Sequence, residues 1–231
     1  MGREPHTLIF YTNKIMTSFK PFPKMARLRR DCLITEKIDG TNASIYIIPR
    51  PPIGSDITNV IAVNDTHLLY AGSRTRWITP ENDNFGFAAW AKANAEELFK
   101  LGEGHHFGEW WGSGIQRGYG YKNGERFFSL FNAARWTEHD RPTYAIPNDN
   151  PVAGMKFTEH APACCKVVPI LYSGLFDTDI ARLVTYDLKV LGSAAAKGFK
   201  NPEGIVVYHT AAGVGFKMTI ENDHQPKGVA Q

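Results

Sequence analysis

Short runs in which apolar and polar residues alternate recur along most of the chain, and this pattern is typical of half-buried β-strands. Turn-rich stretches at 49–56, 79–84 and 141–154 separate groups of these runs, and none has the length of an interdomain linker. The pattern therefore predicts a chain built mainly from short strands. The predicted strands cover residues 43–48, 60–63, 68–73, 105–110, 127–131, 163–168, 205–208 and 214–219.

Two segments instead show the three-to-four spacing of amphipathic helices. The first covers residues 84–102 and the second covers residues 177–192. In the second segment we expect Asp177 or Thr178 to cap the start of the helix and Gly192 to end it. Strands that arrive in runs, with few helices between them, predict an α+β fold with mainly antiparallel sheets.

Composition adds the class of protein to this picture. The chain has 231 residues, of which 43% are hydrophobic, and this suits one folded domain with a substantial core. A formal net charge of +3 neither requires nor excludes nucleic acid as a partner. The three cysteines show neither disulfide nor zinc spacing, residues 1–16 lack the apolar core of a leader peptide, and no run would span a membrane. We therefore expect a cytoplasmic protein without a membrane partner.

One stretch, TEKIDGTNASIYI at residues 35–47, places Lys37 at the end of a strand, beside Asp39 and Gly40. A lysine attacks an electrophile only as the neutral amine, and at pH 7 only about one ordinary lysine in a few thousand is neutral. Burial and nearby cations favour the neutral form. A nucleophilic role for Lys37 therefore predicts a sheltered pocket and a second cation. The alternative is a lysine that simply ends a strand before an Asp-Gly turn, and this short motif alone does not exclude it.

Further stretches also set a polar or charged residue into, or at the tip of, an apolar strand. One such residue is usually a satisfied edge charge, but five together indicate a lined cleft between sheets. The five stretches are GSRTRWI (72–78), FGEWWGSGIQRGYGY (107–121), FFSLFN (127–132), PEGIVVY (202–208) and GFKMT (215–219).

The order of these motifs, from K-x-D-G to K-x-T, resembles the covalent nucleotidyltransferase superfamily of ATP-dependent DNA ligases, RNA ligases and mRNA capping enzymes. Within it, EKIDGTN and FGEWWGSGIQRGYGY are most similar to the RNA ligase 2-like family. DNA ligases usually carry an arginine shortly after K-x-D-G, where this chain has Thr41 and Asn42. Asp39 is a departure, because the most similar relatives have histidine there. The resemblance runs over about residues 33–220 and implies a ligase-type adenylyltransferase domain with sheets flanking a nucleotide cleft.

The resemblance also implies a reaction. Lys37 attacks the α-phosphorus of ATP and forms a lysyl-AMP intermediate, the AMP passes to a 5′-phosphate end, and a 3′-hydroxyl then displaces it. Lys217 supplies the second cation and contacts the α-phosphate. Asp39 orients Lys37 or holds metal-bound water, with shaping of the turn as its alternative. Glu203 binds Mg²⁺ (or Mn²⁺), which keeps part of its hydration shell.

The nucleotide-binding residues implied by the resemblance are the neighbours of the lysine and several strand residues. Arg74, in the SRTR strand, is expected at the ribose or the 5′-phosphate end, and Glu109 at the ribose hydroxyls. Phe131 is expected to stack on adenine, with Phe128 as its rival on the same strand. The full set is Glu36, Ile38, Asn42, Arg74, Glu109, Phe131, Glu203 and Lys217.

Two further departures concern the end of the chain. Thr219 stands where the relatives carry another lysine, which weakens phosphate binding or moves it to Lys200 or Arg117. The relatives also append another domain, whereas only a short tail follows Thr219 here. We therefore expect residues 1–231 to form a single adenylyltransferase domain with no appended C-terminal domain. This domain acts alone or with a partner protein that grips the nucleic acid.

The sequence thus predicts an ATP-dependent RNA ligase that seals 3′-hydroxyl and 5′-phosphate ends, with nicked or broken RNA as its nucleic-acid partner and ATP and Mg²⁺ as cofactors. DNA and hybrid duplexes stay open as substrates. The alternatives are a DNA nick ligase, a GTP-using capping enzyme, and a nucleic-acid end-binding protein that has the same fold but no turnover.

Overall fold

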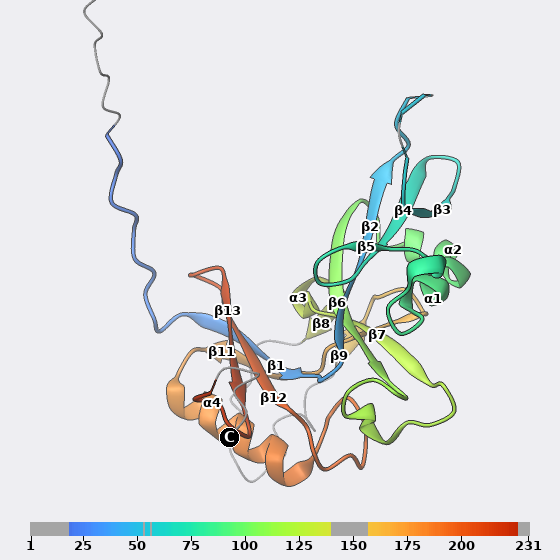
Figure 1. The fold of residues 1–231 in the computed structure, drawn as a ribbon. Helices are drawn as coiled ribbons and strands as arrows, with labels where there is room; N and C mark the ends of the chain where they lie inside the picture. Colours follow the sequence, from blue (N-terminus) through green and yellow to red (C-terminus); the bar gives the residue numbers. More distant parts are fainter. Residues whose placement is uncertain (1–18, 53, 56, 140–156, 226–231) are drawn as a thin grey trace, which may run out of the picture.

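Two sheets form the arms of a V in a computed structural model of the chain (Figure 1). The structure describes residues 19–225 except 53, 56 and 140–156. The predicted break at 141–154 and residues 1–16 lie outside the described residues. Nearly all strand pairs are antiparallel and the helices pack on the sheets, so the predicted α+β fold is confirmed.

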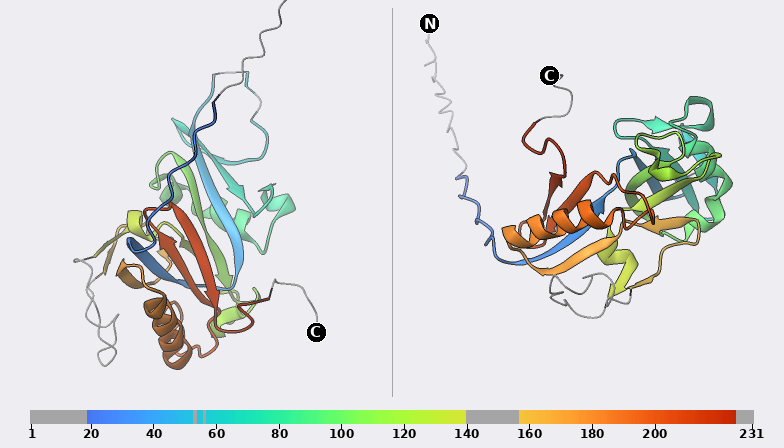
Figure 2. Two further views of the ribbon diagram at one scale, coloured as in Figure 1. Left: turned by 90° about the vertical axis from the view of Figure 1, so that its left-hand side faces the viewer. Right: turned by 90° about the horizontal axis from the view of Figure 1, so that it is seen from below.

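The smaller sheet has four strands in the order β11-β1-β12-β13, and all neighbours are antiparallel. Helix α4 (Thr178–Leu191) covers one of its faces (Figure 2). As predicted, Asp177 caps α4 by accepting a hydrogen bond from the Asp179 N–H (2.9 Å), and Gly192 ends it with φ of 88°. The strands are β1 (Asp31–Lys37), β11 (Ile170–Leu175), β12 (Gly204–His209) and β13 (Val214–Thr219).

The larger sheet has the order β10-β7-β6-β2-β4-β3, with β5 paired to β4 and only β10 parallel to its neighbour among the described strands. Strict alternation divides its residues between two faces. In β2, Ala43, Ile45 and Ile47 are buried in the core, whereas Asn42 and Tyr46 face the other way. The strands are β2 (Thr41–Pro49), β3 (Val60–Val63), β4 (His67–Gly72), β5 (Trp77–Ile78), β6 (Gly104–Gly112), β7 (Arg126–Leu130) and β10 (Cys165–Val167).

The predicted helix over 84–102 is in fact two short helices, α1 (Phe87–Ala93) and α2 (Ala95–Phe99). The backbone leaves the helical region at Asn94 (φ −107°, ψ 19°), whose side chain donates a hydrogen bond to the Trp90 carbonyl (2.8 Å). This local bond competes with the next turn of helix and ends α1.

None of the helices in the described residues has the length and apolar character of a membrane span. Small elements complete the described part of the chain. They are α3 (Ala133–Trp136), the pair β8 (Thr137–His139) and β9 (Phe157–Glu159), and two 3₁₀ turns, η1 (Pro80–Asn82) and η2 (Gly118–Gly120).

Candidate active site

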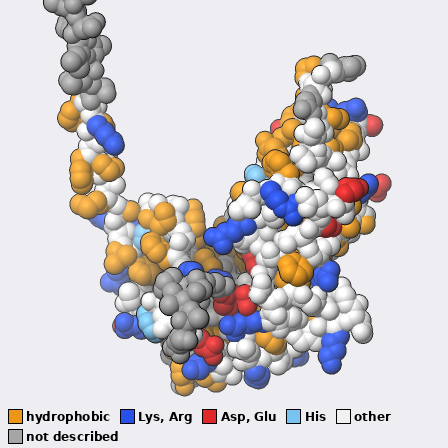
Figure 3. Space-filling view, in the orientation of Figure 1, with side chains coloured by type: hydrophobic (Ala, Val, Ile, Leu, Met, Phe, Trp, Pro, Cys, Tyr) orange, Lys and Arg blue, Asp and Glu red, His pale blue; other side chains and the backbone are white. Residues whose placement is uncertain are grey.

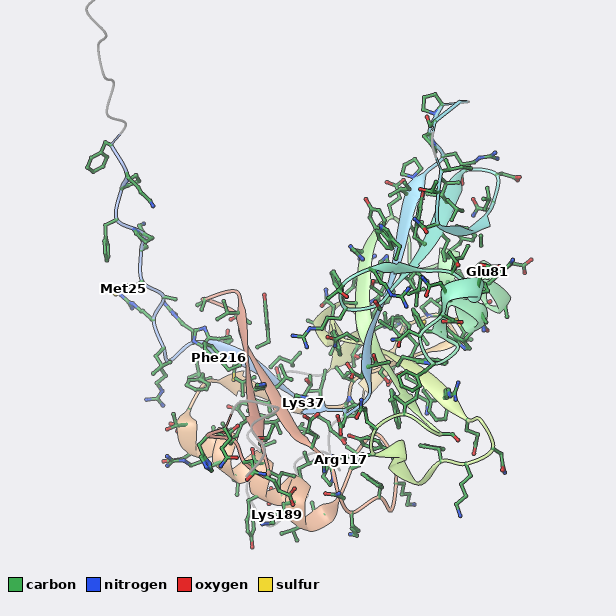
Figure 4. All side chains as sticks on the ribbon, viewed as in Figure 1. Met25, Lys37, Glu81, Arg117, Lys189 and Phe216 are labelled. Atoms are coloured by element: carbon green, nitrogen blue, oxygen red, sulfur yellow. The ribbon has the colours of Figure 1, made fainter. Side chains whose placement is uncertain are left out.

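The lysine singled out in the sequence lies where the two sheets meet. Lys37 ends β1 in the smaller sheet, and after three residues the chain enters β2 in the larger one. Figure 3 shows a hollow between the two arms, with charged side chains at its base. Figure 4 places Lys37 where the two arms meet. Ile38 anchors the crossing in the core of the larger sheet. Gly40 has no room for a side chain, because a Cβ there would lie 2.4 Å from the Trp110 carbonyl oxygen.

Lys37 forms an ion pair with Glu203, which stands directly before β12. The Lys37 side chain is 21% exposed and that of Glu203 is 4% exposed, so the pair is largely sheltered. Gly204, the next residue, pairs with Lys37 across the strands. Lys37 is therefore sheltered, as a nucleophilic lysine needs to be, and its charged partner is a carboxylate.

The second predicted cation, Lys217, lies on the same face of the smaller sheet as Lys37. Paired strand residues point to the same side, and the cross-strand rows are Lys37–Gly204–Thr219 and Thr35–Val206–Lys217. The two lysines are thus two strands apart, about 10 Å sideways. Both lie on the face that α4 leaves uncovered.

Arg117 ties the turn after Lys37 to the loop before Glu203. Its Nε donates to Asp39 Oδ2 (3.1 Å), and its Nη1 donates to the carbonyl oxygen (3.0 Å) and Oδ1 (2.8 Å) of Asn201. The guanidinium therefore fixes the two segments that carry the ion pair. Sequence reasoning placed Arg117 only as a substitute phosphate contact and missed this role.

Tyr119 supports the same turn from the other side. Its hydroxyl oxygen accepts a hydrogen bond from the Asp39 N–H (2.8 Å), and its ring is buried against Trp111 and Phe199. Burial raises the pKa of the Tyr119 phenol well above its usual range. The GIQRGYGY stretch at 114–121 thus supplies both residues that shape the lysine turn.

Glu109 in β6 and Asn42 in β2 are cross-strand partners, and both lie on the face of the larger sheet opposite the Ala43–Ile45–Ile47 face. Glu109 accepts hydrogen bonds from Asn42 Nδ2 (3.0 Å) and from the Gly40 N–H (3.0 Å). Burial raises its pKa to about 7, although both bonds and the charge of Lys37 oppose this shift. Glu109 thus holds the lysine turn in place, and each of its oxygens keeps a lone pair that can accept from a ribose hydroxyl.

Of the two candidate stacking residues, the structure exposes Phe131 (43%) and buries Phe128 completely. Phe128 packs against Phe87 and Trp90 in the core. Phe131 directly follows β7, and its N–H donates to the Phe107 carbonyl oxygen (2.9 Å). Phe107 is itself exposed and was missed from the sequence, although it stands two residues before Glu109 and so shares its face.

The expectation of an SRTR strand is wrong. Residues 73–76 form a tight turn between β4 and β5, closed by a hydrogen bond from the Ser73 N–H to the Arg76 carbonyl oxygen (2.9 Å). Arg74 is exposed at the tip of this turn. Ser44 pairs with Gly72 in the antiparallel strands β2 and β4. Two residues further along this register, Arg74 in the turn lies opposite Asn42.

Glu36, another predicted site residue, points away from the Lys37 face. It is buried, and its carboxylate accepts hydrogen bonds from Ser193 Oγ (2.6 Å) and from the N–H groups of Ala194 (2.8 Å) and Ala195 (2.9 Å). Burial raises the pKa of Glu36. In this structure Glu36 fastens the loop after α4 to β1.

Thr219 is engaged in the turn that follows β13. Its Oγ1 donates to the Glu221 carbonyl oxygen (2.8 Å), and its N–H donates to Asp223 Oδ1 (2.8 Å). Lys200, one suggested substitute for the missing lysine, donates to the Leu191 carbonyl oxygen at the end of α4 (2.9 Å). Lys200 and Arg117 are thus both occupied by contacts within the protein.

The carboxylates at the site suit a divalent ion that arrives with phosphate. Within the described ranges, no three His, Cys, Asp or Glu side chains gather as a metal cage. Mg²⁺ is commonly held by one or two carboxylates together with substrate phosphates and water. Glu203, with Glu109 within electrostatic range, fits that pattern.

The chain is similar to the RNA ligase of Naegleria gruberi, solved as one mutant with ATP and Mn (20% identity, TM-score 0.47, 84% of this chain and 51% of that one) and as another with AMP and Mn (19%, 0.47, 82% and 49%). The chain spans about half the length of these structures. No curated protein matches it. A family model described as RNA ligase matches residues 30–219, which is most of the sequence, and the chain therefore belongs to the RNA ligase family.

Proposed function

We propose that this chain is an ATP-dependent RNA ligase that works through a lysyl-AMP intermediate on Lys37. The observation that carries the proposal is the sheltered Lys37–Glu203 ion pair at the junction of the two sheets. Around it lie a second lysine, Lys217, on the same face and the hydrogen-bonded pair of Glu109 and Asn42. The exposed aromatic ring is that of Phe131. A nucleophile, a metal ligand, a phosphate contact and a nucleoside site are the parts that adenylyl transfer requires.

The three steps exchange one phosphorus bond each. Lys37 Nζ, after losing a proton, bonds to the α-phosphorus of ATP while the bond to pyrophosphate breaks. An oxygen of a 5′-phosphate end then bonds to the same phosphorus, and the P–N bond breaks to return the amine. Finally a 3′-hydroxyl oxygen, after losing its proton, bonds to the 5′-phosphorus of the activated end, and AMP leaves.

The ion pair gives Glu203 two alternative partners. While Glu203 faces Lys37, it stabilises the ammonium, which has no lone pair for attack. Glu203 and the nucleotide phosphates would hold Mg²⁺ or Mn²⁺, and such an ion neutralises charge on the phosphoryl oxygens when bound. With its carboxylate so engaged, Glu203 no longer stabilises the charged lysine. Lys217, on the same face, adds positive potential that favours the neutral amine.

A sealing assay tests the proposed activity and its substrate. We expect the full chain with ATP and Mg²⁺ to join a 3′-hydroxyl to a 5′-phosphate end in RNA, and Lys37→Ala to abolish joining. Parallel assays with nicked DNA and hybrid duplexes, and with GTP in place of ATP, separate the DNA ligase and capping alternatives. A chain that binds RNA ends but joins none of these substrates contradicts the proposal.

A further inference from the structure

Beyond the nucleotide site, five aromatic side chains cover the face of the larger sheet that its core does not use. They come from β2, β4, β5 and β6 and are here called the aromatic strip: Tyr46, Tyr70, Trp77, His105 and Phe107. Along β6, Glu109, Phe107 and His105 are two residues apart and so share one face. The strip therefore begins beside the candidate active site and runs away from Lys37.

Four of the five rings of the strip are stacked on one another, and Tyr70 is tilted against Tyr46 and Trp77 (44° and 47°). The centroids of His105 and Phe107 lie 4.3 Å apart with 23° between the planes, and those of Trp77 and His105 lie 5.7 Å apart with 17°. Tyr46 and Trp77 stack at 5.7 Å and 20°. These near-parallel planes hold the rings in a fixed, preorganised arrangement.

Two rings of this stack, one at its end and one within it, are open to solvent. Phe107 is 55% exposed and Trp77 is 38% exposed. Hydrophobic side chains gather along the inner side of the arm that contains β2 and β4 (Figure 3). Large exposed aromatic groups in one place mark a binding surface more often than scattered ones do.

The charge beside the strip suits a phosphate backbone. The turn directly before Trp77 carries Arg74 and Arg76. Arg76 is anchored by its bond to the Asn82 carbonyl oxygen (3.0 Å), and Arg74 is exposed at the tip. None of the five strip residues carries a negative charge at neutral pH. Aromatic stacking surfaces flanked by arginine are the usual means of binding single-stranded nucleic acid.

We propose that the aromatic strip binds unpaired nucleotides of the RNA substrate by base stacking, with Arg74 at their phosphates. This inference rests on the proposed function and makes its substrate more specific. Bases within a duplex are already stacked on one another and hidden from the strip. The preferred substrate is therefore an RNA end that carries a single-stranded stretch, rather than a nick in a continuous duplex.

Fluorescence anisotropy with a short labelled oligouridylate tests the strip directly. We expect Trp77→Ala and Phe107→Ala to weaken binding roughly 5- to 150-fold, the effect typical of losing one stacked base, whereas Trp77→Phe retains most of the affinity. Tyr186→Ala is the matched control, because Tyr186 is 63% exposed on α4, outside the strip. The same RNA presented as a duplex should bind more weakly and be insensitive to these changes. Wild-type affinity in both alanine variants, or equal binding of duplex, overturns the proposal.

A second measurement keeps the test valid if an alanine variant unfolds. A 4-thiouridine oligonucleotide crosslinked to the wild-type chain should label peptides that contain residues 77 or 105–107, and labelling only elsewhere overturns the proposal. Lys37–AMP formation without RNA separates the two hypotheses. Trp77→Ala should form the adduct at the wild-type rate. If the wild type forms no adduct, the proposed function fails, while binding and crosslinking still decide the strip.

Discussion

Lys37 and Glu203, which are 166 residues apart in the chain, form an ion pair at the point where the two sheets meet. Lys37 ends β1 and Glu203 directly precedes β12, and Arg117 ties their two segments together. The pair therefore depends on the whole fold.

Removing the charge of Glu203 is predicted to slow the first chemical step. In Glu203→Gln the ammonium loses its partner, but the divalent ion loses its ligand, and we expect adenylylation to fall at least roughly 100-fold, as for other groups that stabilise charge in a transition state. Single-turnover labelling with radioactive ATP measures the rate, and the exposed Glu96→Gln serves as control. Faster labelling in Glu203→Gln would mean that Glu203 only restrains Lys37.

Arg117 is predicted to act on both stability and activity. Arg117→Met leaves Asp39 without this partner and frees the loop at Asn201, and we expect a loss of about 2 kcal/mol in unfolding free energy, or about 4–8 °C in Tm. Arg117→Lys should recover little, because one ammonium does not reproduce the forked guanidinium. Arg182→Met, which removes an exposed pair with Asp179, should change neither quantity. Thermal melts and adenylylation rates check this, and unchanged values in Arg117→Met contradict it.

Glu109 is predicted to make stability depend on pH. Its pKa in the folded chain is raised from 4.5 to about 7, so the folded state binds this proton more tightly than the unfolded state does. The contribution of Glu109 to stability is therefore fully present at low pH and is lost as pH rises from about 4.5 to about 7. Glu109→Gln should lose this part of the slope in urea unfolding across that range. Glu36, which also has a raised pKa, is present in both proteins and cancels in the comparison. Parallel slopes would contradict the prediction.

The two phenylalanines near the end of β7 are predicted to behave oppositely. Phe128→Ala opens a cavity in the core and should cost about 3–5 kcal/mol of stability. Phe131→Ala removes an exposed ring and should leave stability within about 0.5 kcal/mol, while it weakens ATP binding. Chemical unfolding and ATP titration of both variants measure the two effects. Normal ATP affinity in Phe131→Ala excludes it as the adenine contact.

The sequence predicted the half-buried strands well, because their residues alternate as in β2 and β6. It placed a strand end at Lys37 but gave β1 no bounds, and it missed β11. Strand β1 is enclosed between two strands and buries residues on both faces, so that no period of two appears. The break at Asn94 and the turn at Arg74 each involve local hydrogen bonds of one side chain and its backbone that periodicity does not reveal.

For the site, motif order placed Lys37, Glu203 and Lys217 in one cleft, and in the structure all three lie in or directly beside strands of the smaller sheet. The bridging role of Arg117 and the aromatic strip were not predictable. Both arise from contacts between segments far apart in the chain. In the sequence alone, each of these residues has the pattern of an ordinary surface position.

The most direct test of the account is the mass of the intact chain after incubation with ATP and Mg²⁺, followed by mapping of the modified peptide. The account predicts a gain of one AMP, attached through a phosphoamide bond to Lys37 and lost in Lys37→Ala. An unmodified chain under these conditions, or AMP attached to a different residue, would contradict it.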